Sequence, residues 1–249
     1  MLELWELAAL AGVGVVAGFV DAVAGGGGLI ALPALLSFGV PPIAALATNK
    51  AQGIVGTAVA AITFWRQGLV PLRPMLVPMV ATFLGAYAGA MAVKALDVAV
   101  LEWLVPAAVI GVALYFVFSP AAGDLDKRAL LPFALGVPAM GMAVGFYDGA
   151  FGPGTGSFMM VGFVALFGLG VTRALAHTKV LNVTSNAAAL ALFLPAGDIV
   201  WPAALAMAAG QVAGGWLGAR TSLKYGARII RPLVILVSIA LAARLLLFR

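Results

Sequence analysis

Long apolar runs recur along the whole chain, and short polar or glycine-rich stretches separate them. The first run extends from Leu4 to Val20 and the last from Leu233 to Phe248. Runs of this length approach or exceed the roughly 18 apolar residues that indicate a membrane-spanning helix. The stretches between the runs leave no room for a soluble domain. The pattern therefore predicts an all-α polytopic membrane protein.

The pattern of glycines and charged residues occurs twice. Gly18, Asp21 and Gly25 align with Gly145, Asp148 and Gly152 at a shift of 127 positions, and Lys50 aligns with Lys179 at a shift of 129. Coincidence explains single glycine or alanine pairs in a chain of this composition, but it does not explain paired aspartates and lysines. We therefore predict two homologous halves, residues 1–122 and 123–249, that form one transport unit.

Each half is predicted to contain about four long helices and one short helix that follows a glycine-rich break. The long helices are expected at 4–22, 43–65, 75–93 and 98–118, and at 130–147, 173–194, 202–221 and 229–248. The short helices are expected at 29–38 and 158–167. If each break and its short helix together cross the membrane, each half crosses five times and the second copy is inverted. If the breaks are re-entrant, each half crosses four times and the copies are parallel.

The distribution of basic residues favours inverted copies. With five crossings per half and both termini outside, nine Lys and Arg residues fall on the cytoplasmic side and two on the outer side, as the positive-inside tendency expects. The residues on that side are Arg66, Arg73, Lys127, Arg128, Arg173, Arg220, Lys224, Arg228 and Arg231, and the outer side keeps Lys94 and Arg249. In the parallel arrangement the basic residues divide almost evenly between the two sides.

The composition narrows the functional classes. Hydrophobic residues make up 64% of the chain and charged residues only 9%, whereas a soluble domain has about 25% charged residues. The chain has no cysteine and one histidine, so a thiolate site or a histidine metal cluster is excluded. The basic residues lie mainly in short loops between apolar runs, which membrane orientation explains better than nucleic-acid binding. We expect no metal, no cofactor and no nucleic-acid partner.

The first candidate site is the pair of glycine-rich breaks. Unwound backbone inside a membrane leaves N–H and C=O groups without partners, which is tolerated where protein or a watery cavity satisfies them. The N-terminus of each short helix also presents free N–H groups and a partial positive charge, which suit an oxyanion. The candidate substrate-binding residues are Gly25, Gly26, Gly27 and Gly28, and Gly152, Gly154, Thr155, Gly156 and Ser157. Either Thr155 or Ser157 is expected to cap the second short helix.

Other glycines indicate close helix packing instead of a site. Gly85 and Gly89 in the first half, and Gly214 and Gly218 in the second, have the small-xxx-small spacing that lets two helix backbones approach. We therefore expect them at helix–helix contacts.

The second candidate site is a pair of lysines inside predicted helices. A lysine at a helix centre costs about 2.5 to 3.5 kcal/mol on insertion scales, so Lys50 and Lys179 need a partner or a purpose. Lys179, Asn182 and Asn186 share one helical face, which should point to the interior. The candidate substrate-binding residues here are Thr48, Asn49, Lys50, Gln52, Thr178, Lys179 and Asn182. The alternative is that both lysines snorkel to the membrane interface from within two or three turns of a helix end.

Asp21, Asp148 and His177 are candidate coupling or structural residues. The two aspartates either pair with the lysines, cap the broken backbone or bind a coupling proton, and the first two roles are favoured. His177 titrates nearest neutrality but aligns with Thr48, so it is a candidate modulator.

Several of these motifs occur together in one known family. They are the first break followed by Pro33, the run 47–50, and the runs 145–149 and 152–156. This combination, which covers nearly the whole chain, resembles the TauE/SafE sulfite exporter family. The resemblance implies a multi-pass carrier in the inner (plasma) membrane of a bacterium or archaeon, with family substrates that include sulfite, thiosulfate and organosulfonates such as sulfoacetate. It also implies that the breaks, 48–50 and 178–179 line the path, although His177 and Thr178 replace the Thr48–Asn49 pair in the second copy.

The leading prediction is a secondary transporter of small anions, most directly sulfur oxyanions or organosulfonates, with its site at the interface of the two repeats. A passive anion channel and a carrier of small carboxylates are the alternatives. An intramembrane enzyme is disfavoured because no nucleophile and base stand at a persuasive spacing. The expected partners are a small anionic substrate and the lipid bilayer, and proton or ion coupling and a homodimer remain open.

Overall fold

The computed structural model describes residues 2–97, 100, 126 and 128–226, and these residues form eight helices and no strand. The first four helices are α1 (Leu4–Ala24), α2 (Gly28–Ser37), α3 (Pro42–Arg66) and α4 (Leu72–Lys94). The others are α6 (Phe133–Ala150), α7 (Thr155–Phe167), α8 (Val171–Ala196) and α9 (Trp201–Tyr225). The all-α prediction is therefore confirmed. The helices predicted at 98–118 and 229–248, the boundary between the halves at 122/123, and Lys127, Arg228, Arg231 and Arg249 lie outside the described residues.

The predicted helix bounds lie within four residues of the observed ones, and two of the differences have local causes. Helix α6 begins at Phe133, three residues later than predicted, because its N-cap is Pro132 in an extended conformation. Helix α7 begins at Thr155, three residues earlier than predicted, because the left-handed backbone of Gly154 (φ 78°) already starts the first turn. A left-handed glycine is the usual way to reverse the chain at a helix end without a Cβ clash.

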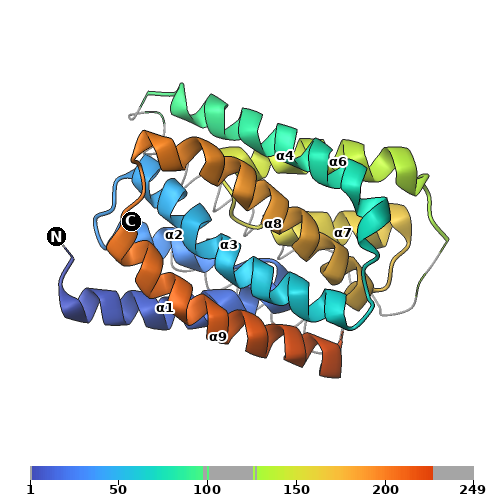
Figure 1. The fold of residues 1–249 in the computed structure, drawn as a ribbon, viewed down its shortest axis with the longest axis horizontal. Coiled ribbons are helices and arrows are strands. Elements are labelled where there is room, and N and C mark those ends of the chain that lie inside the picture. The colour runs from blue at the N-terminus through green and yellow to red at the C-terminus, as the bar shows by residue number, and fades with distance from the viewer. Residues whose placement is uncertain (1, 98–99, 101–125, 127, 227–249) are drawn as a thin grey trace.

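The helices form three layers (Figure 1). Helices α1 and α9 pack together on one side, α4 and α6 pack together on the other, and α3 and α8 lie between these pairs and contact each other. The short helices α2 and α7 also lie in the middle layer. In Figure 1, α1 enters the molecule from one end and α6 from the opposite end, so the two broken helices meet near the centre.

The glycines expected at helix contacts lie where two backbones touch. A Cβ atom at Gly85 would overlap the carbonyl of Met142, and one at Gly214 would overlap the carbonyl of Val15. Gly89 and Gly218 are likewise packed against the backbone of α6 and α1, at Phe146 and Phe19. The prediction of close packing is confirmed, and it explains how α4 approaches α6 and how α9 approaches α1.

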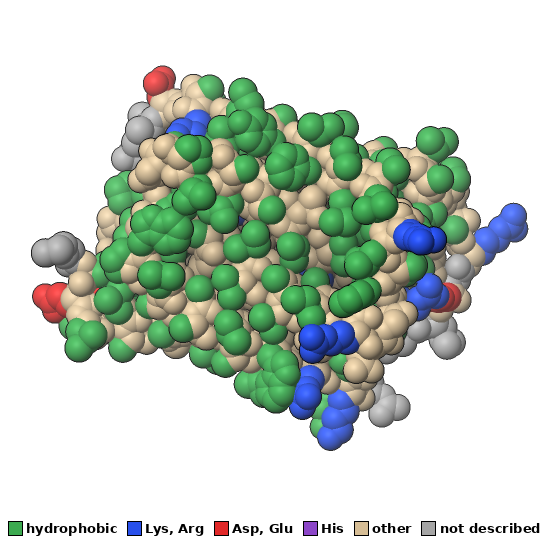
Figure 2. Space-filling model, in the orientation of Figure 1, with side chains coloured by type: hydrophobic (Ala, Val, Ile, Leu, Met, Phe, Trp, Pro, Cys, Tyr) green, Lys and Arg blue, Asp and Glu red, His purple; other side chains and the backbone are tan. Residues whose placement is uncertain are grey.

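The outer surface is apolar along the helices and charged at the ends. Figure 2 shows hydrophobic side chains over most of one face and a group of Lys and Arg side chains at one end. On α4, Leu76, Val77 and Leu84 are exposed, as expected for a face that contacts lipid. Among the described helices, α1 and α4 are long and apolar enough to span a membrane by length and composition alone. The spans predicted for the other long helices are not confirmed by this test.

Candidate functional site

The two glycine-rich breaks cross each other at the centre of the molecule. Gly25, which ends α1, has φ 75° and lies against the backbone of Gly156 in α7, so a Cβ on either residue would overlap the other chain segment. Ser157 reinforces the crossing, because its hydroxyl donates to the carbonyl of Ala24. The breaks are therefore in direct backbone contact, as the prediction of a shared site requires.

Side chains satisfy part of the unwound backbone of the second break. The Tyr147 hydroxyl donates to the Pro153 carbonyl at 2.8 Å, and Thr155 Oγ1 lies 2.7 Å from the Gly152 carbonyl. The prediction that Thr155 or Ser157 caps α7 is wrong: the N-cap is Gly154, which has no side-chain capping bond. Both hydroxyls are used elsewhere: the crossing of the breaks brings the Ala24 carbonyl to Ser157, and Thr155 has acceptors in its own half, the Gly152 carbonyl and Asp148.

Two buried ion pairs join the breaks to the central helices. Lys50 Nζ lies 2.7 Å from Asp148 Oδ1, and Lys179 Nζ lies 2.7 Å from Asp21 Oδ2. The lysine side chains are 2% and 0% exposed. The predicted pairing is confirmed, and the snorkelling alternative is wrong because neither ammonium group leaves the interior. Each pair connects a lysine of one predicted half with an aspartate of the other.

Asp21 also meets the capping prediction. Its Oδ1 accepts a hydrogen bond from the backbone N–H of Gly27 at 3.4 Å, while its Oδ2 pairs with Lys179. Pairing and capping are therefore not alternatives at this residue, because a carboxylate can serve two donors with its two oxygens.

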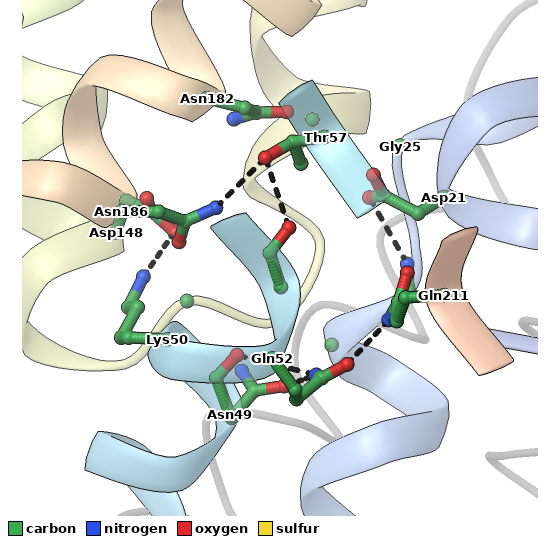
Figure 3. A pocket seen from close by; sticks show the side chains of 15 residues that line it. Asp21, Gly25, Asn49, Lys50, Gln52, Thr57, Asp148, Asn182, Asn186 and Gln211 are labelled. Carbon is green, nitrogen blue, oxygen red and sulfur yellow. Dashed lines mark hydrogen bonds and ion pairs between the residues drawn. The ribbon is translucent and has the colours of Figure 1, made fainter. Parts of the chain in front are cut away.

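An internal cavity of about 40 Å³ lies where the breaks, α3, α8 and α9 meet (Figure 3). Among the predicted site residues, its lining contains Asp21, Gly25, Gly27, Gly28, Asn49, Lys50, Gln52, Asp148, Gly152, Gly156 and Asn182. The lining also contains Gly53, Thr57, Asn186 and Gln211. One water needs roughly 10 to 15 Å³ of such space. The cavity therefore has room for a few waters or one compact ion.

Amide side chains form a connected wall on one side of this cavity. Gln52 Nε2 donates to Asn49 Oδ1 at 2.8 Å, and Gln211 Nε2 donates to Gln52 Oε1 at 2.5 Å (Figure 3). Asn186 Nδ2 donates to Thr57 Oγ1 at 3.5 Å. Asn49 Nδ2 lies beside the lining residue Gly28, 3.5 Å from where a Cβ at Gly28 would be. A wall of this kind offers neutral donors and no additional charge.

Gln211 is the missed lining residue that comes from an element with no predicted site residue. It comes from α9, which contributes none of the predicted site residues, and it is 2% exposed. The signal was present, because a single glutamine interrupts the otherwise apolar and small run 202–219 of the helix predicted at 202–221. A buried amide in an apolar helix requires a hydrogen-bond partner. That requirement could have identified Gln211 as a candidate site residue.

Several predicted residues support the site without lining the cavity. Thr48 accepts the backbone N–H of Val200 at 3.0 Å. Thr178 is fully buried, and its hydroxyl has no hydrogen-bond partner among the described residues. The residues outside the lining are Gly26, Thr48, Gly154, Thr155, Ser157, Thr178 and Lys179, and Lys179 reaches the cavity only through Asp21.

His177 is buried but lies outside the cavity lining. Its Nδ1 is 2.8 Å from the carbonyl of Arg173, one turn earlier in α8. The ring packs against Phe133 and Phe163, with centroid distances of 6.0 and 5.4 Å. These contacts place it in the aromatic core around α7, and a modulating role for it stays a prediction.

Comparison with known proteins gives a consistent set of similarities. The family model described as "Sulfite exporter TauE/SafE" matches residues 10–245. The chain is 45% identical over 232 residues to "Probable membrane transporter protein ORF9" of Sinorhizobium sp, which covers 93% of this chain and 88% of that protein. It is 43% identical over 239 residues to a "Probable membrane transporter protein" of Haemophilus influenzae, covering 96% and 94%. It is 42% identical over 237 residues to "Probable membrane transporter protein YfcA" of Escherichia coli K12, covering 94% and 87%. No solved structure matches significantly.

Proposed function

Because the chain belongs to the sulfite exporter TauE/SafE family, we propose that this membrane transporter is a secondary carrier of small anions that binds them in the central cavity. One observation carries the proposal: a polar cavity lies between two broken helices inside a shell of apolar helices. In a membrane, unwound backbone and buried charge are expected where a substrate passes.

The charges around the cavity set how an anion would be held. Lys50 and Lys179 are each neutralised by an aspartate, so the cavity itself carries no formal excess charge. An anion would therefore rely first on neutral donors, the Asn49 and Asn186 amides and the N-termini of α2 and α7. Hydrogen bonds to a charged group contribute about 1.5 to 3 kcal/mol each, so a few such donors support millimolar to micromolar affinity.

The size of the cavity favours a compact substrate. A volume of about 40 Å³ suits a small sulfur oxyanion such as sulfite or thiosulfate better than an organosulfonate with a carbon chain, which would need a wider cavity. Small carboxylates of similar size remain the second substrate class, because amide donors do not distinguish a carboxylate from a sulfur oxyanion by charge alone.

We also propose that residues 1–122 and 123–249 are inverted repeats and that the inner membrane protein is multi-pass. In the two halves, α1 corresponds to α6 and α4 corresponds to α9. The main contacts follow this correspondence, since α1 packs on α9 and α6 packs on α4. The glycine contacts support the same exchange: Gly85 meets Met142, and its counterpart Gly214 meets Val15, the counterpart of Met142.

The proposed orientation places the basic end in the cytoplasm. The groove between the ends of α3 and α9 contains Arg66, Arg220 and Lys224, as the positive-inside tendency expects for a cytoplasmic side. The chain has no native cysteine, so single cysteines report accessibility cleanly. In sealed cells, a membrane-impermeant maleimide should label Ala196→Cys and not Gln67→Cys. The opposite labelling pattern would reverse the orientation.

Flux through proteoliposomes tests the carrier proposal. Preloading vesicles with unlabelled thiosulfate should accelerate uptake of labelled thiosulfate, and uptake should saturate with concentration. Lys50→Met should reduce this flux, whereas Lys94→Met, which removes a half-buried lysine paired with Asp198 away from the cavity, should not. Ohmic anion conductance at channel rates would support the passive channel instead, and the absence of flux for sulfur oxyanions and carboxylates alike would contradict the proposal.

A further inference from the structure

The two buried ion pairs are not equivalent. Asp21 uses both carboxylate oxygens, Oδ2 for Lys179 and Oδ1 for the Gly27 N–H. Asp148 uses only Oδ1, which lies 2.7 Å from both Lys50 Nζ and Thr155 Oγ1. Asp148 Oδ2 is buried and has no hydrogen-bond partner among the described residues. The difference is local: the position of Thr155 in the second break corresponds to Gly28 in the first, which has no hydroxyl.

An ionised carboxylate with one unpartnered buried oxygen is an unfavourable arrangement. Asp148 is 3% exposed and lines the cavity, so bulk water does not compensate Oδ2. Burial disfavours the charged form of a carboxyl group, and a proton on the free oxygen removes the penalty. The opposing influence is Lys50, whose ammonium group favours the ionised form. Asp148 therefore has its counter-charge on Oδ1, while Oδ2 has an open position for a hydrogen.

Thr155 can respond to a change in the charge of Asp148. Its hydroxyl has one hydrogen and lies 2.7 Å from two acceptors, Asp148 Oδ1 and the Gly152 carbonyl. A hydroxyl donates to one acceptor at a time. When Asp148 is neutral it is the weaker acceptor, so the hydrogen bond would shift to Gly152, in the break itself. The hydrogen bond of the Thr155 hydroxyl within the second break thus depends on whether Asp148 carries a proton.

We propose that Asp148 takes up one proton with each monovalent anion that enters the cavity, an inference that rests on the proposed carrier function. The proton comes from the water that admits the anion and binds to Oδ2. Lys50 remains an ammonium ion and turns its charge from Asp148 to the anion. The two lysine–aspartate pairs at the empty cavity sum to zero charge, so an anion alone would leave the site with a net negative charge, whereas an anion and a proton together leave it neutral.

The other charged groups around the cavity are consistent with Asp148 as the proton site. Across the cavity, Asp21 has a partner on each oxygen, Gly27 on Oδ1 and Lys179 on Oδ2, so a proton on either oxygen would displace an existing partner. His177 is outside the cavity lining. The remaining lining side chains on α3, α8 and α9 are amides, a hydroxyl and Lys50. By linkage, the anion must raise the proton affinity of Asp148 by the factor by which the proton raises the affinity for the anion.

The experiment uses the full chain in proteoliposomes with methanesulfonate, a monovalent anion of a strong acid that carries no titratable proton itself. A trapped pH-sensitive dye reports proton movement during methanesulfonate uptake. We expect about one proton to enter with each anion, and uptake to fall with rising external pH, approaching tenfold per pH unit once Asp148 is ionised. Methanesulfonate flux without proton movement, and with a flat pH profile, would overturn the inference and leave the carrier function intact. No flux of any anion would instead refute the carrier function.

Two variants assign the proton to a residue. Asp148→Asn imitates the protonated acid, so whatever methanesulfonate flux it retains should carry no proton and show no pH dependence, even where the flux itself is reduced. Asp21→Asn is the matched control and should retain one proton per anion even where its flux is reduced. Proton movement that persists in Asp148→Asn, or that disappears in Asp21→Asn alone, would contradict the assignment. If Asp148→Asn does not fold, the proton count and pH profile of the unmodified protein decide.

Discussion

Filling the cavity from Gly53 should abolish transport without unfolding the protein. Gly53 lines the cavity from the middle of α3. A Cβ atom at this position would lie 3.7 Å from Asn186 Nδ2, an ordinary van der Waals contact, and it would meet no other atom within 4 Å. The alanine variant is therefore tolerated by the packing, and a longer side chain would extend into the cavity.

The magnitudes follow from the same geometry. Gly53→Ala removes a flexible residue from a helix interior, which stabilises the fold by up to about 1 kcal/mol. Gly53→Leu adds three more carbons than Gly53→Ala to a cavity of about 40 Å³. For comparison, a single water needs roughly 10 to 15 Å³. The leucine and a polyatomic anion cannot both fit. Overpacking of this size costs about 1 to 3 kcal/mol, which the helix propensity partly offsets.

Thiosulfate counterflow and thermal unfolding in detergent measure the two effects separately. Gly53→Leu should lose at least tenfold in counterflow while it unfolds within a few degrees of the unmodified protein, and Gly53→Ala should lose much less. The matched control is Gly12→Leu on α1, where a Cβ meets nothing within 4 Å and the residue is exposed. Normal counterflow in Gly53→Leu, or an equal loss in Gly12→Leu, would refute the placement of the substrate in this cavity.

Three further predictions concern the stability of the site. Lys179→Met leaves Asp21, whose side chain is 15% exposed, without its cation and should lower the free energy of unfolding by about 3 kcal/mol. The double variant Lys179→Met with Asp21→Asn should recover most of this loss in a thermal-shift assay, and additive losses would contradict the pairing. Gly25→Ala should reduce the yield of folded protein far more than Gly39→Ala, because both glycines have φ near 75° but only Gly25 touches another backbone, and equal yields would argue against the crossing of the breaks. Asp126 accepts the Gly170 N–H at 2.6 Å and pairs with Arg173, which lowers its pKa below the usual 3.8. A carboxyl group whose pKa is lowered by folding stabilises the fold at pH values above its unfolded-state pKa, and this stabilisation is lost as the pH falls through its folded-state pKa. The melting temperature of the unmodified protein should therefore exceed that of Asp126→Asn at neutral pH and approach it in acid. A difference that widens in acid would contradict this linkage.

Residue patterns were sufficient to predict the helices, because each break contains glycines that end a helix and each long helix is an apolar run. The same patterns predicted the partners of Lys50 and Lys179, since a lysine inside an apolar helix needs a counter-charge. They did not predict which aspartate meets which lysine, because that choice depends on the crossing of segments more than 90 residues apart.

The misassigned roles of Thr155 and Ser157 have a similar cause. Both hydroxyls stand where a helix N-cap is expected, and local sequence favours that role. The crossing of the breaks supplies a carbonyl acceptor for Ser157 at Ala24. Thr155 instead donates within its own half, to Gly152 or Asp148, and Gly154 takes the N-cap position. Gln211 was missed because no neighbour in the sequence indicates its role. Its hydrogen-bond partner, Gln52, lies on a helix distant in sequence.

Anomalous diffraction tests the central claim most directly. Selenite is the heavier analogue of sulfite, and crystals of the unmodified protein grown with selenite contain no other selenium. The account predicts one strong selenium peak per chain inside the cavity between Lys50, Asn49 and Asn182, and loss of that peak in Gly53→Leu. A selenium peak outside this cavity, or an unoccupied cavity at selenite concentrations that saturate transport, would contradict it.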